Sequence, residues 1–277
     1  MVKKILVPTD FSSQAESALK VAAQLAKKNN SEIYLLHILE MPVHLTDLMS
    51  SGASAPAPEA VFFMKQTHKK FEEVLENSYL DGIEVIETVS FEDVLNGIID
   101  ATKKNDIDII VMGSHGSSGF EELFIGSNAE KVVRTSEKPV LVIKEDCNIF
   151  EVQDFVYATN FDDEDKPSLV AAHQFAKQLQ AKLHLVWINT ANSFKTTSET
   201  EEKMNLMISD LPIDNYTLNI YNDINVEKGI LNFAKSVNAG LIGISTHGRK
   251  GLSHFINGSL GEDVVNHAKR PVLTFKI

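Results

Sequence analysis

The chain has 277 residues, of which 43% are hydrophobic and 23% charged, and its formal net charge is −12. The length suits one large domain or two of ordinary size. The excess of 38 acidic over 26 basic residues disfavours binding to nucleic acid, which needs a basic surface. The sequence has no apolar run near the roughly 20 residues that cross a bilayer. Its single cysteine excludes an intrachain disulfide.

The N-terminal apolar stretch is too short for a secretory signal, and it continues directly into a strand pattern. We therefore expect a cytoplasmic protein without a membrane partner. We also expect no nucleic-acid partner, because of the charge balance.

Short apolar runs alternate with helical patterns along the chain, and the second half repeats the order of the first. Continuously apolar runs are typical of strands covered on both faces, and strands that alternate with helices predict a parallel sheet with right-handed crossovers. The predicted strands lie near residues 3–9, 32–38, 83–89, 108–113 and 139–144, and near 153–159, 183–188, 216–221, 240–245 and 271–276.

The sequence thus predicts an α/β protein with two tandem doubly wound domains. Each domain is expected to be a mainly parallel five-stranded sheet with helices on both faces. The expected bounds are 1–144 and 153–277, with a linker at 145–152. In the first half, the Ser-, Ala- and Pro-rich stretch from Met41 to Pro58 predicts a loop that opens the next helix, with a lid over a nearby site as the alternative.

A glycine segment follows the fourth predicted strand of each half. The first segment runs from Gly113 through Gly116 to Gly126, and the second starts at Ser245 and continues to Gly258. In a doubly wound sheet, ligands bind beyond the carboxyl ends of the strands where the strand order reverses. Glycines at such a place let backbone amides approach a phosphate closely.

A serine ends each glycine segment and precedes a predicted helix. Ser127 is followed by Glu130, and Ser259 by Glu262, so both pairs predict a capping box. A helix start also suits a phosphate. The spacing fits neither a Walker loop nor a dinucleotide fingerprint. Phosphate binding and a tight structural loop therefore both stay open on spacing alone.

Two further features favour structural interpretations. The acidic run Asp162–Asp165 precedes a predicted helix with Pro167 in its first turn, where acidic side chains interact favourably with the helix dipole. We interpret this run as a helix start rather than a metal cluster. His37 and Trp187 occupy matching strand positions, and we expect both to fill or edge the core.

The ordered combination of motifs resembles the universal stress protein family. The first half carries it in Ile5-Leu-Val-Pro-Thr-Asp10-Phe-Ser, Asp108-Ile-Ile-Val-Met-Gly-Ser-His-Gly116, Gly126-Ser127 and Lys138-Pro-Val-Leu-Val-Ile143. The second half repeats it with Ser245-Thr-His-Gly-Arg-Lys-Gly251 and Gly258-Ser259. Because the resemblance covers nearly the whole chain, the protein resembles a tandem member of this family.

The resemblance implies an adenine nucleotide alpha hydrolase-like fold that binds ATP, or else AMP or ADP, with Mg²⁺ on the phosphates rather than on protein side chains. Adenosine would contact the ends of the first two strands, and the glycine segment would surround the phosphates. The residues implied for the first site are Pro8, Thr9, Asp10, Ile38, Met112, Gly113, Gly116, Gly126, Ser127 and Asn128. Those for the second site are Ala158, Thr159, Asn160, Ile188, Ile244, Gly248, Arg249, Gly258, Ser259 and Leu260.

The second site departs from the family pattern. Asn160 stands at the position of Asp10, and Ser245 at that of Gly113. Asparagine can still hydrogen-bond a ribose, whereas a side chain at Ser245 is expected to narrow the loop or to force a different backbone angle. Arg249 adds a positive charge. We therefore expect a nucleotide in the first site and a weaker second site.

The leading hypothesis is a nucleotide-binding regulatory protein of the stress response, in which ATP alters contact with a protein partner. A slow ATPase or phosphotransferase is one alternative, although the nearest acids to the phosphates, Glu121 and Glu122, are expected to be solvated. A nucleotide-free interaction module is another. The apolar strands at 140–143 and 272–275 need covering. The resemblance implies that they pair as an intrachain pseudo-dimer, with further homodimerisation left open.

Overall fold

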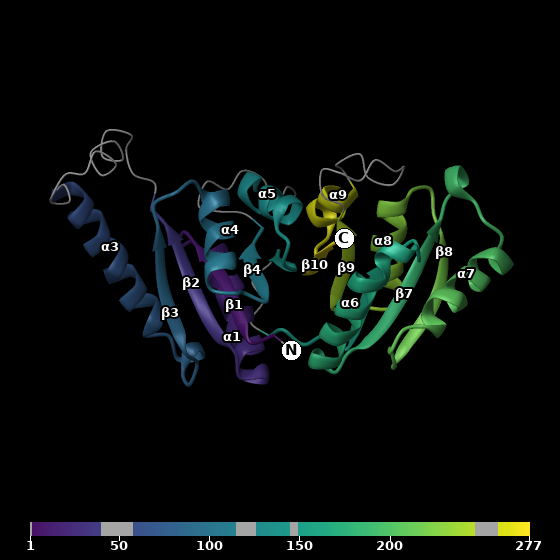
Figure 1. The fold of residues 1–277 in the computed structure, drawn as a ribbon, viewed down its shortest axis with the longest axis horizontal. Helices are drawn as coiled ribbons and strands as arrows, with labels where there is room; N and C mark the ends of the chain where they lie inside the picture. The colour runs from purple at the N-terminus through teal and green to yellow at the C-terminus, as the bar shows by residue number, and fades with distance from the viewer. Residues whose placement is uncertain (1, 40–57, 115–125, 145–148, 247–259) are drawn as a thin grey trace.

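The structure is a computed structural model that describes residues 2–39, 58–114, 126–144, 149–246 and 260–277. One sheet runs through the whole molecule, in the order β3-β2-β1-β4-β5-β10-β9-β6-β7-β8 (Figure 1). The first half contributes β1 (Lys4–Thr9), β2 (Glu32–Ile38), β3 (Val85–Ser90), β4 (Ile109–Gly113) and β5 (Val140–Ile143). The second half contributes β6 (Asp154–Ala158), β7 (Lys182–Asn189), β8 (Tyr216–Asn222), β9 (Leu241–Thr246) and β10 (Val272–Lys276).

All the strands predicted from the sequence are confirmed, with ends shifted by a residue or two. Within each half, the strands pair in parallel. The halves meet where β5 and β10 pair antiparallel, with Leu273 opposite Leu141 and Val272 opposite Val142. We call this pairing the seam. It confirms the expected pairing of the two halves within one chain.

Helices cover both faces of the sheet, as doubly wound halves require (Figure 1). In the part of the chain that the structure describes, no helix combines the length and the apolar character needed to cross a bilayer. One face carries α1 (Ser13–Asn29), α3 (Pro58–Leu75), α6 (Lys166–Leu179) and α7 (Thr197–Ser209). The other carries α4 (Val94–Lys104), α5 (Ser127–Thr135), α8 (Val226–Ser236) and α9 (Leu260–His267).

Local sequence fixes the ends of the first helix in each half. In α1, the Ser12 side chain accepts a hydrogen bond from the Ala15 amide and so caps the helix start. Asn30 ends α1 in the left-handed conformation with φ 53°, and Gln180 ends α6 in the same way with φ 60°. Helix α3 begins at Pro58, as expected. The loop or lid predicted before it lies outside the described residues.

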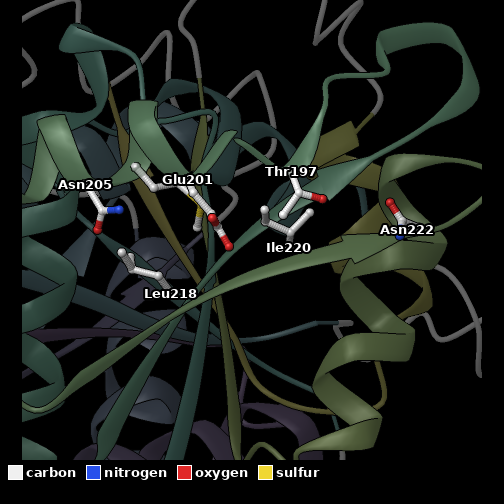
Figure 2. Close-up of a pocket in the computed structure, with 7 residues that line it drawn as sticks. Thr197, Glu201, Asn205, Leu218, Ile220 and Asn222 are labelled. Atoms are coloured by element: carbon white, nitrogen blue, oxygen red, sulfur yellow. The ribbon is translucent and has the colours of Figure 1, made fainter. Parts of the chain in front are cut away.

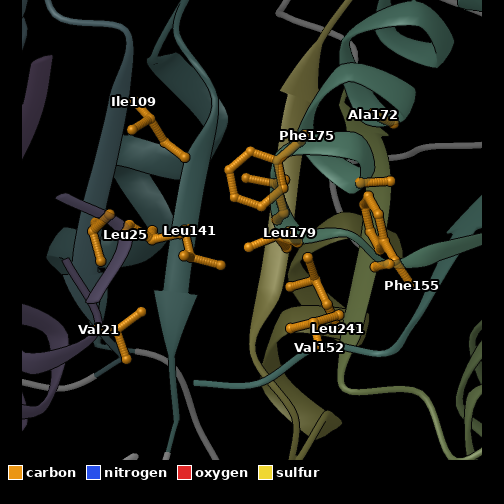
Figure 3. Packing of buried hydrophobic residues seen from close by; sticks show 14 of the residues in the cluster. Val21, Leu25, Ile109, Leu141, Val152, Phe155, Ala172, Phe175, Leu179 and Leu241 are labelled. Carbon is orange, nitrogen blue, oxygen red and sulfur yellow. The ribbon is translucent and has the colours of Figure 1, made fainter. Parts of the chain in front are cut away.

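The core on the α1 face runs across the seam without interruption. Val21 and Leu25 of α1 belong to the same buried cluster as Phe175 of α6, Leu141 of β5 and Leu241 of β9 (Figure 3). Because the two halves share one apolar core, they pack as one body and not as two separate domains joined by a linker.

Two lysines add polar contacts across the seam. Lys144 follows β5, and its Nζ donates to the Asn266 carbonyl in the last turn of α9 at 3.2 Å. Lys276 ends β10, and its Nζ donates to the Thr135 carbonyl at the end of α5 at 3.1 Å. Each lysine therefore brings a positive charge to the carboxyl end of the other half's last helix, where the helix dipole favours it.

Burial lowers the pKa of Lys144 to about 8, and this predicts a pH-dependent stability. The native state gives up this proton near pH 8, whereas an unfolded lysine keeps it until about pH 10.4. Stability rises with pH wherever the unfolded state binds more protons. The free energy of unfolding of the native protein should therefore rise from pH 8 to pH 10 relative to that of Lys144→Met.

Urea unfolding of the two proteins at several pH values measures this difference. Lys276→Met is the matched control, because it removes the corresponding lysine from an exposed contact. A difference between the native protein and Lys144→Met that stays flat from pH 8 to pH 10 would show that the burial does not perturb Lys144.

Candidate functional site

The strand order reverses next to β1 in the first half. Strand β1 lies between β2 and β4, so the chain leaves β1 toward one side and returns on the other. Asp10 directly follows β1, and Gly113 ends β4. Both therefore lie at the carboxyl ends of adjacent strands at the switch point, which is where doubly wound sheets bind ligands.

A hydrogen bond brings the end of the first glycine segment back to β4. The Gly126 amide donates to the Ser114 carbonyl at 2.6 Å, and the fully buried Ser114 in turn donates its amide to the Ile143 carbonyl at 2.9 Å. Helix α5 begins at the next residue, Ser127. The start of α5 is thereby fixed beside the end of β4.

The expected capping box at this helix is wrong. The residue that caps α5 is Gly126, with no hydrogen bond from a side chain, and Ser127 is already the first helical residue. An N-cap side chain must come from the residue before the helix, and here that residue is a glycine. The first amides of α5 therefore lack a capping side chain, and a helix start of this kind suits an anion. Ser127 and Asn128 are both exposed. The capping box predicted at Ser259 lies outside the described residues.

The turn after β1 has a strained but ordered shape. Thr9 Oγ1 accepts from the Phe11 amide at 2.9 Å, and Asp10 Oδ1 accepts from the Ser12 amide at 3.0 Å. Phe11 itself has φ 64°, a conformation that side-chain-bearing residues seldom adopt. Phe161 repeats it with φ 52° in the second half. The turn leaves the exposed Asp10 carboxylate at the strand end.

His37 supports this turn, a role that the sequence analysis missed by expecting only packing. Its Nδ1 lies 2.8 Å from the Thr9 carbonyl, so Nδ1 carries a proton and donates it. Burial lowers the pKa of His37, and the nearby Lys70 lowers it further, against opposing effects of the Thr9 hydrogen bond and Asp10. The ring also contacts the Phe11 ring, with 4.7 Å between centroids. The sequence offered one signal for this role, because His37 directly precedes Ile38, a residue predicted for the first site.

A groove of about 370 Å³ lies between the turn, α1 and α3. Lys70 of α3, which lines it, lies 5.1 Å from the centre of the Phe11 ring. Burial raises the pKa of Tyr79, another lining residue, to about 12, so this phenol keeps its proton at neutral pH. The groove is lined by Thr9, Asp10, Phe11, Ser12, Glu16, Leu19, Lys70, Glu73, Val74, Asn77 and Tyr79.

A second groove, of about 490 Å³, lies between α7 and the edge strand β8 (Figure 2). Leu218, Ile220 and Asn222 share one face of β8 because successive side chains of a strand alternate. Thr197 and Glu201 line the groove from α7. It contains no residue predicted for either site, and it lies away from the switch point.

The apolar residues predicted for the first site lie at different depths. Met112 is buried in the core on the α4 face, with 6% of its surface exposed. Ile38 and Pro8 are half-buried, and a Cβ at Gly97 of α4 would lie 2.6 Å from Ile38 Cδ1. All three lie at, or one residue before, the carboxyl ends of their strands. Their contact with adenine stays a prediction, and Gly116 lies outside the described residues.

Position 113 requires a glycine because a side chain has no space there, and not because the backbone adopts an angle that only glycine favours. A Cβ at this position would lie 2.8 Å from the Gln14 carbonyl oxygen of α1, closer than real Cβ contacts allow. Among the described glycines, positive φ is confined to Gly82. A side chain at the corresponding Ser245 therefore needs room from the neighbouring helix. Ser245 is not among the described residues with positive φ, so its side chain does not force a left-handed backbone.

The second site brings together a different set of groups. Ala158 and Asn160 are half-buried at the end of β6, and Ile188 and Ile244 are buried near the ends of β7 and β9. Thr159 is also buried, and its Oγ1 donates to Asp165 Oδ2 at 2.9 Å. Leu260 begins α9. The remaining predicted residues lie outside the described part of the chain, and they are Gly248, Arg249, Gly258 and Ser259.

Together these features define a duplicated, doubly wound α/β protein with polar groups and a helix start at the switch point. The sequence model of the Universal stress protein family matches residues 1–144 and 222–276. The chain belongs to the universal stress protein family.

The chain is similar both to relatives that match about half of it and to relatives that match its full length. Universal stress protein MJ0577 of Methanocaldococcus jannaschii is 34% identical over 155 residues, which are 52% of this chain and 96% of the relative. Slr1230 of Synechocystis is 22% identical over 298 residues, with 99% of this chain and all of the relative covered. The crystal structure of a universal stress protein from Archaeoglobus fulgidus shares the fold, with a TM-score of 0.68, 22% identity and coverage of 99% and 98%. The tandem arrangement therefore recurs in full-length relatives.

Proposed function

We propose that this chain binds ATP or another adenine nucleotide in its first half and acts as a regulatory protein of the stress response. The observation that carries the proposal is the hydrogen bond from the Gly126 amide to the Ser114 carbonyl. It holds the start of α5, without a capping side chain, beside the carboxyl end of β4. This arrangement offers backbone donors to an anion at the switch point of the sheet.

The chemistry of the neighbouring groups supports a nucleotide rather than a free phosphate. Asp10 presents a carboxylate at the end of β1, and a carboxylate accepts hydrogen bonds from ribose hydroxyls. Its orientation is held by the Ser12 amide, while His37 holds the Thr9 carbonyl one residue earlier. Phosphates would meet the first amides of α5, and Mg²⁺ would accompany them on the phosphate oxygens.

Regulation would follow from what α5 contacts at its other end. The helix begins at the expected phosphate position and ends at Thr135, whose carbonyl accepts from Lys276 of the second half. A nucleotide that fixes the start of α5 would also change the position of α5 against the seam. The protein surface around the seam would then change, and with it the contact with a protein partner.

Gly126→Val tests the site directly. The backbone at Gly126 has φ −64° and ψ 146°, which any residue can adopt, so the substitution adds bulk without backbone strain. We expect ATP affinity to fall at least about tenfold, which corresponds to about 1.4 kcal/mol. Isothermal titration calorimetry measures the affinity, and circular dichroism checks the fold.

A pair of matched substitutions separates the nucleoside contact from general charge. Asp10→Ala should weaken binding, whereas Asp81→Ala, at an exposed position before β3, should not. Unchanged affinity in a folded Gly126→Val protein would overturn the assignment of the site. Release of ADP above a control without protein would favour the ATPase alternative instead.

A further inference from the structure

The sheet has two edges, and strands β3 and β8 form them in the part of the chain that the structure describes. Directly before β8, the Asn215 carbonyl accepts from the Leu183 amide of β7 at 3.1 Å. The amide and carbonyl of one strand residue point to the same side, and successive residues alternate. The backbone groups of Tyr216, Leu218 and Ile220 therefore point away from β7, toward the free edge.

The edge at β3 is protected by a charge, whereas the edge at β8 is not. The Ile33 amide of β2 donates to the Glu84 carbonyl at 2.9 Å, so the backbone groups of Glu87 point outward by the same alternation. Glu87 lies in the middle of β3, with its carboxylate 3.4 Å from His68 Nδ1 of α3. A charged side chain in an edge strand opposes pairing with another chain. Strand β8, Tyr216–Asn222, contains neither a charged residue nor a proline.

The groove between α7 and β8 is lined by the β8 residues whose backbone groups point outward. These residues are Leu218, Ile220 and Asn222 (Figure 2). Leu218 and Ile220 are half-buried, so part of their apolar surface is accessible in the groove. A strand added to β8 would lie about 4.8 Å from it, with every second side chain on the α7 face. One extended segment can therefore pair with the edge and fill the groove at the same time.

The groove carries a negative charge. Glu201 of α7 is the one charged residue that lines it, and its carboxylate points toward β8 (Figure 2). Lys195 and Lys203 lie instead over the Trp187 ring of β7, at 5.3 Å and 5.1 Å from its centre. Lys203 is also paired with Asp162 at 2.7 Å. A segment complementary to the groove therefore carries a lysine or an arginine among apolar residues.

A second copy of the chain fits this edge less well. Two β8 strands that pair antiparallel are related by a two-fold axis perpendicular to the sheet, so both α7 helices would cover the same face. The two Glu201 carboxylates would then lie on the same side of one continuous sheet, and like charges repel. The net charge of −12 acts in the same direction.

Exposed apolar side chains stand on both segments at the end of the groove. Asn189 of β7 ties these segments together, because its Nδ2 donates to the Lys195 carbonyl at 3.2 Å and to Asn222 Oδ1 at 3.1 Å. Phe194, before α7, is 69% exposed, and Ile224, after β8, is 70% exposed. Aromatic side chains are enriched in protein interfaces. This end of the groove therefore suits contact with a protein.

We propose that the free edge of β8 and the groove beside α7 bind an extended, basic segment of a partner protein, which adds a strand to the sheet. The alternate side chains of this segment are apolar where they meet Leu218 and Ile220, and a lysine or an arginine pairs with Glu201. The inference goes beyond the proposed function, because the groove shares no residue with the nucleotide site.

Random twelve-residue peptides, displayed on phage and selected on the full chain, provide the probe. We expect the selected peptides to alternate apolar and polar residues around a lysine or an arginine. Glu201→Lys should weaken their binding at least about tenfold in fluorescence polarisation, because it places like charges together. Glu202→Lys is the matched control, because Glu202 is exposed on the same helix and does not line the groove. Neither variant should change the affinity for ATP.

Hydrogen exchange followed by NMR tests whether the peptide adds a strand. Bound peptide should slow the exchange of the Leu218 and Ile220 amides at least about tenfold, whereas the Asn219 amide, which points to β7, should change little. Peptides that bind Glu201→Lys as tightly as the native chain, or that protect neither amide, would overturn the inference, and so would a selection that enriches no peptide. A native dimer that Ile220→Lys separates in sedimentation equilibrium would overturn it in favour of a second copy.

Discussion

Leu141→Ala is expected to destabilise the whole molecule, by about 2–5 kcal/mol, and not the first half alone. Leu141 is fully buried in β5, directly opposite Leu273 of β10. It belongs to the core cluster that includes α1 of the first half and α6 of the second. A cavity at this position therefore removes packing from both halves at once.

The native chain should accordingly unfold in one calorimetric transition, and Leu141→Ala should move that transition as a unit. Differential scanning calorimetry measures both, because a single cooperative unit has equal calorimetric and van't Hoff enthalpies. Two separate transitions in the native protein would show that the seam does not couple the halves.

A double-mutant cycle tests the seam itself. Leu141→Ala and Leu273→Ala remove side chains that face each other, so their effects should depart from additivity by about 0.5–3 kcal/mol. Leu35→Ala is the matched control, because it removes the same buried group from β2. Strands β1 and β4 separate β2 from the seam strand β5. Its effect should add to that of Leu273→Ala within about 0.5 kcal/mol.

The strands of this fold could be predicted because their physics is local. Runs such as Val140–Ile143 are apolar at every position, and all four residues are buried in the structure. The repeat of Gly97 and Gly229, by contrast, has a tertiary cause that became visible only because the two halves share it. A Cβ at either position would approach Ile38 or Ile188 within 2.6 Å and 2.4 Å, so α4 and α8 can lie close on their strands.

The features that were missed depend on partners far apart in the chain. Asp165 meets Ser245 across 80 positions, and Lys276 reaches Thr135 across 141. The periodicity of a sequence does not indicate contacts between residues so far apart in the chain. The acidic run was correctly interpreted as a helix start, but the burial of its last member, Asp165, and its role as a hydrogen-bond acceptor were not predicted.

Phe71→Ala is expected to cost about 3–5 kcal/mol, the usual range for a buried phenylalanine. Phe71 is the fully buried residue by which α3 packs onto the site. Its ring meets that of Phe11 edge to face at 5.3 Å between centroids, and that of His37 at 6.5 Å. These two residues shape and hold the turn that carries Asp10, so the substitution should also weaken ATP binding.

Phe62→Ala is the matched control on the same helix. Phe62 is 57% exposed, and a surface substitution usually changes stability by less than about 0.5 kcal/mol. Urea unfolding with and without ATP gives both quantities for each variant. Equal losses in the two variants would mean that α3 is held by its surface rather than by Phe71. A large loss of stability at Phe71 with unchanged ATP affinity would separate the packing of α3 from the geometry of the Asp10 turn.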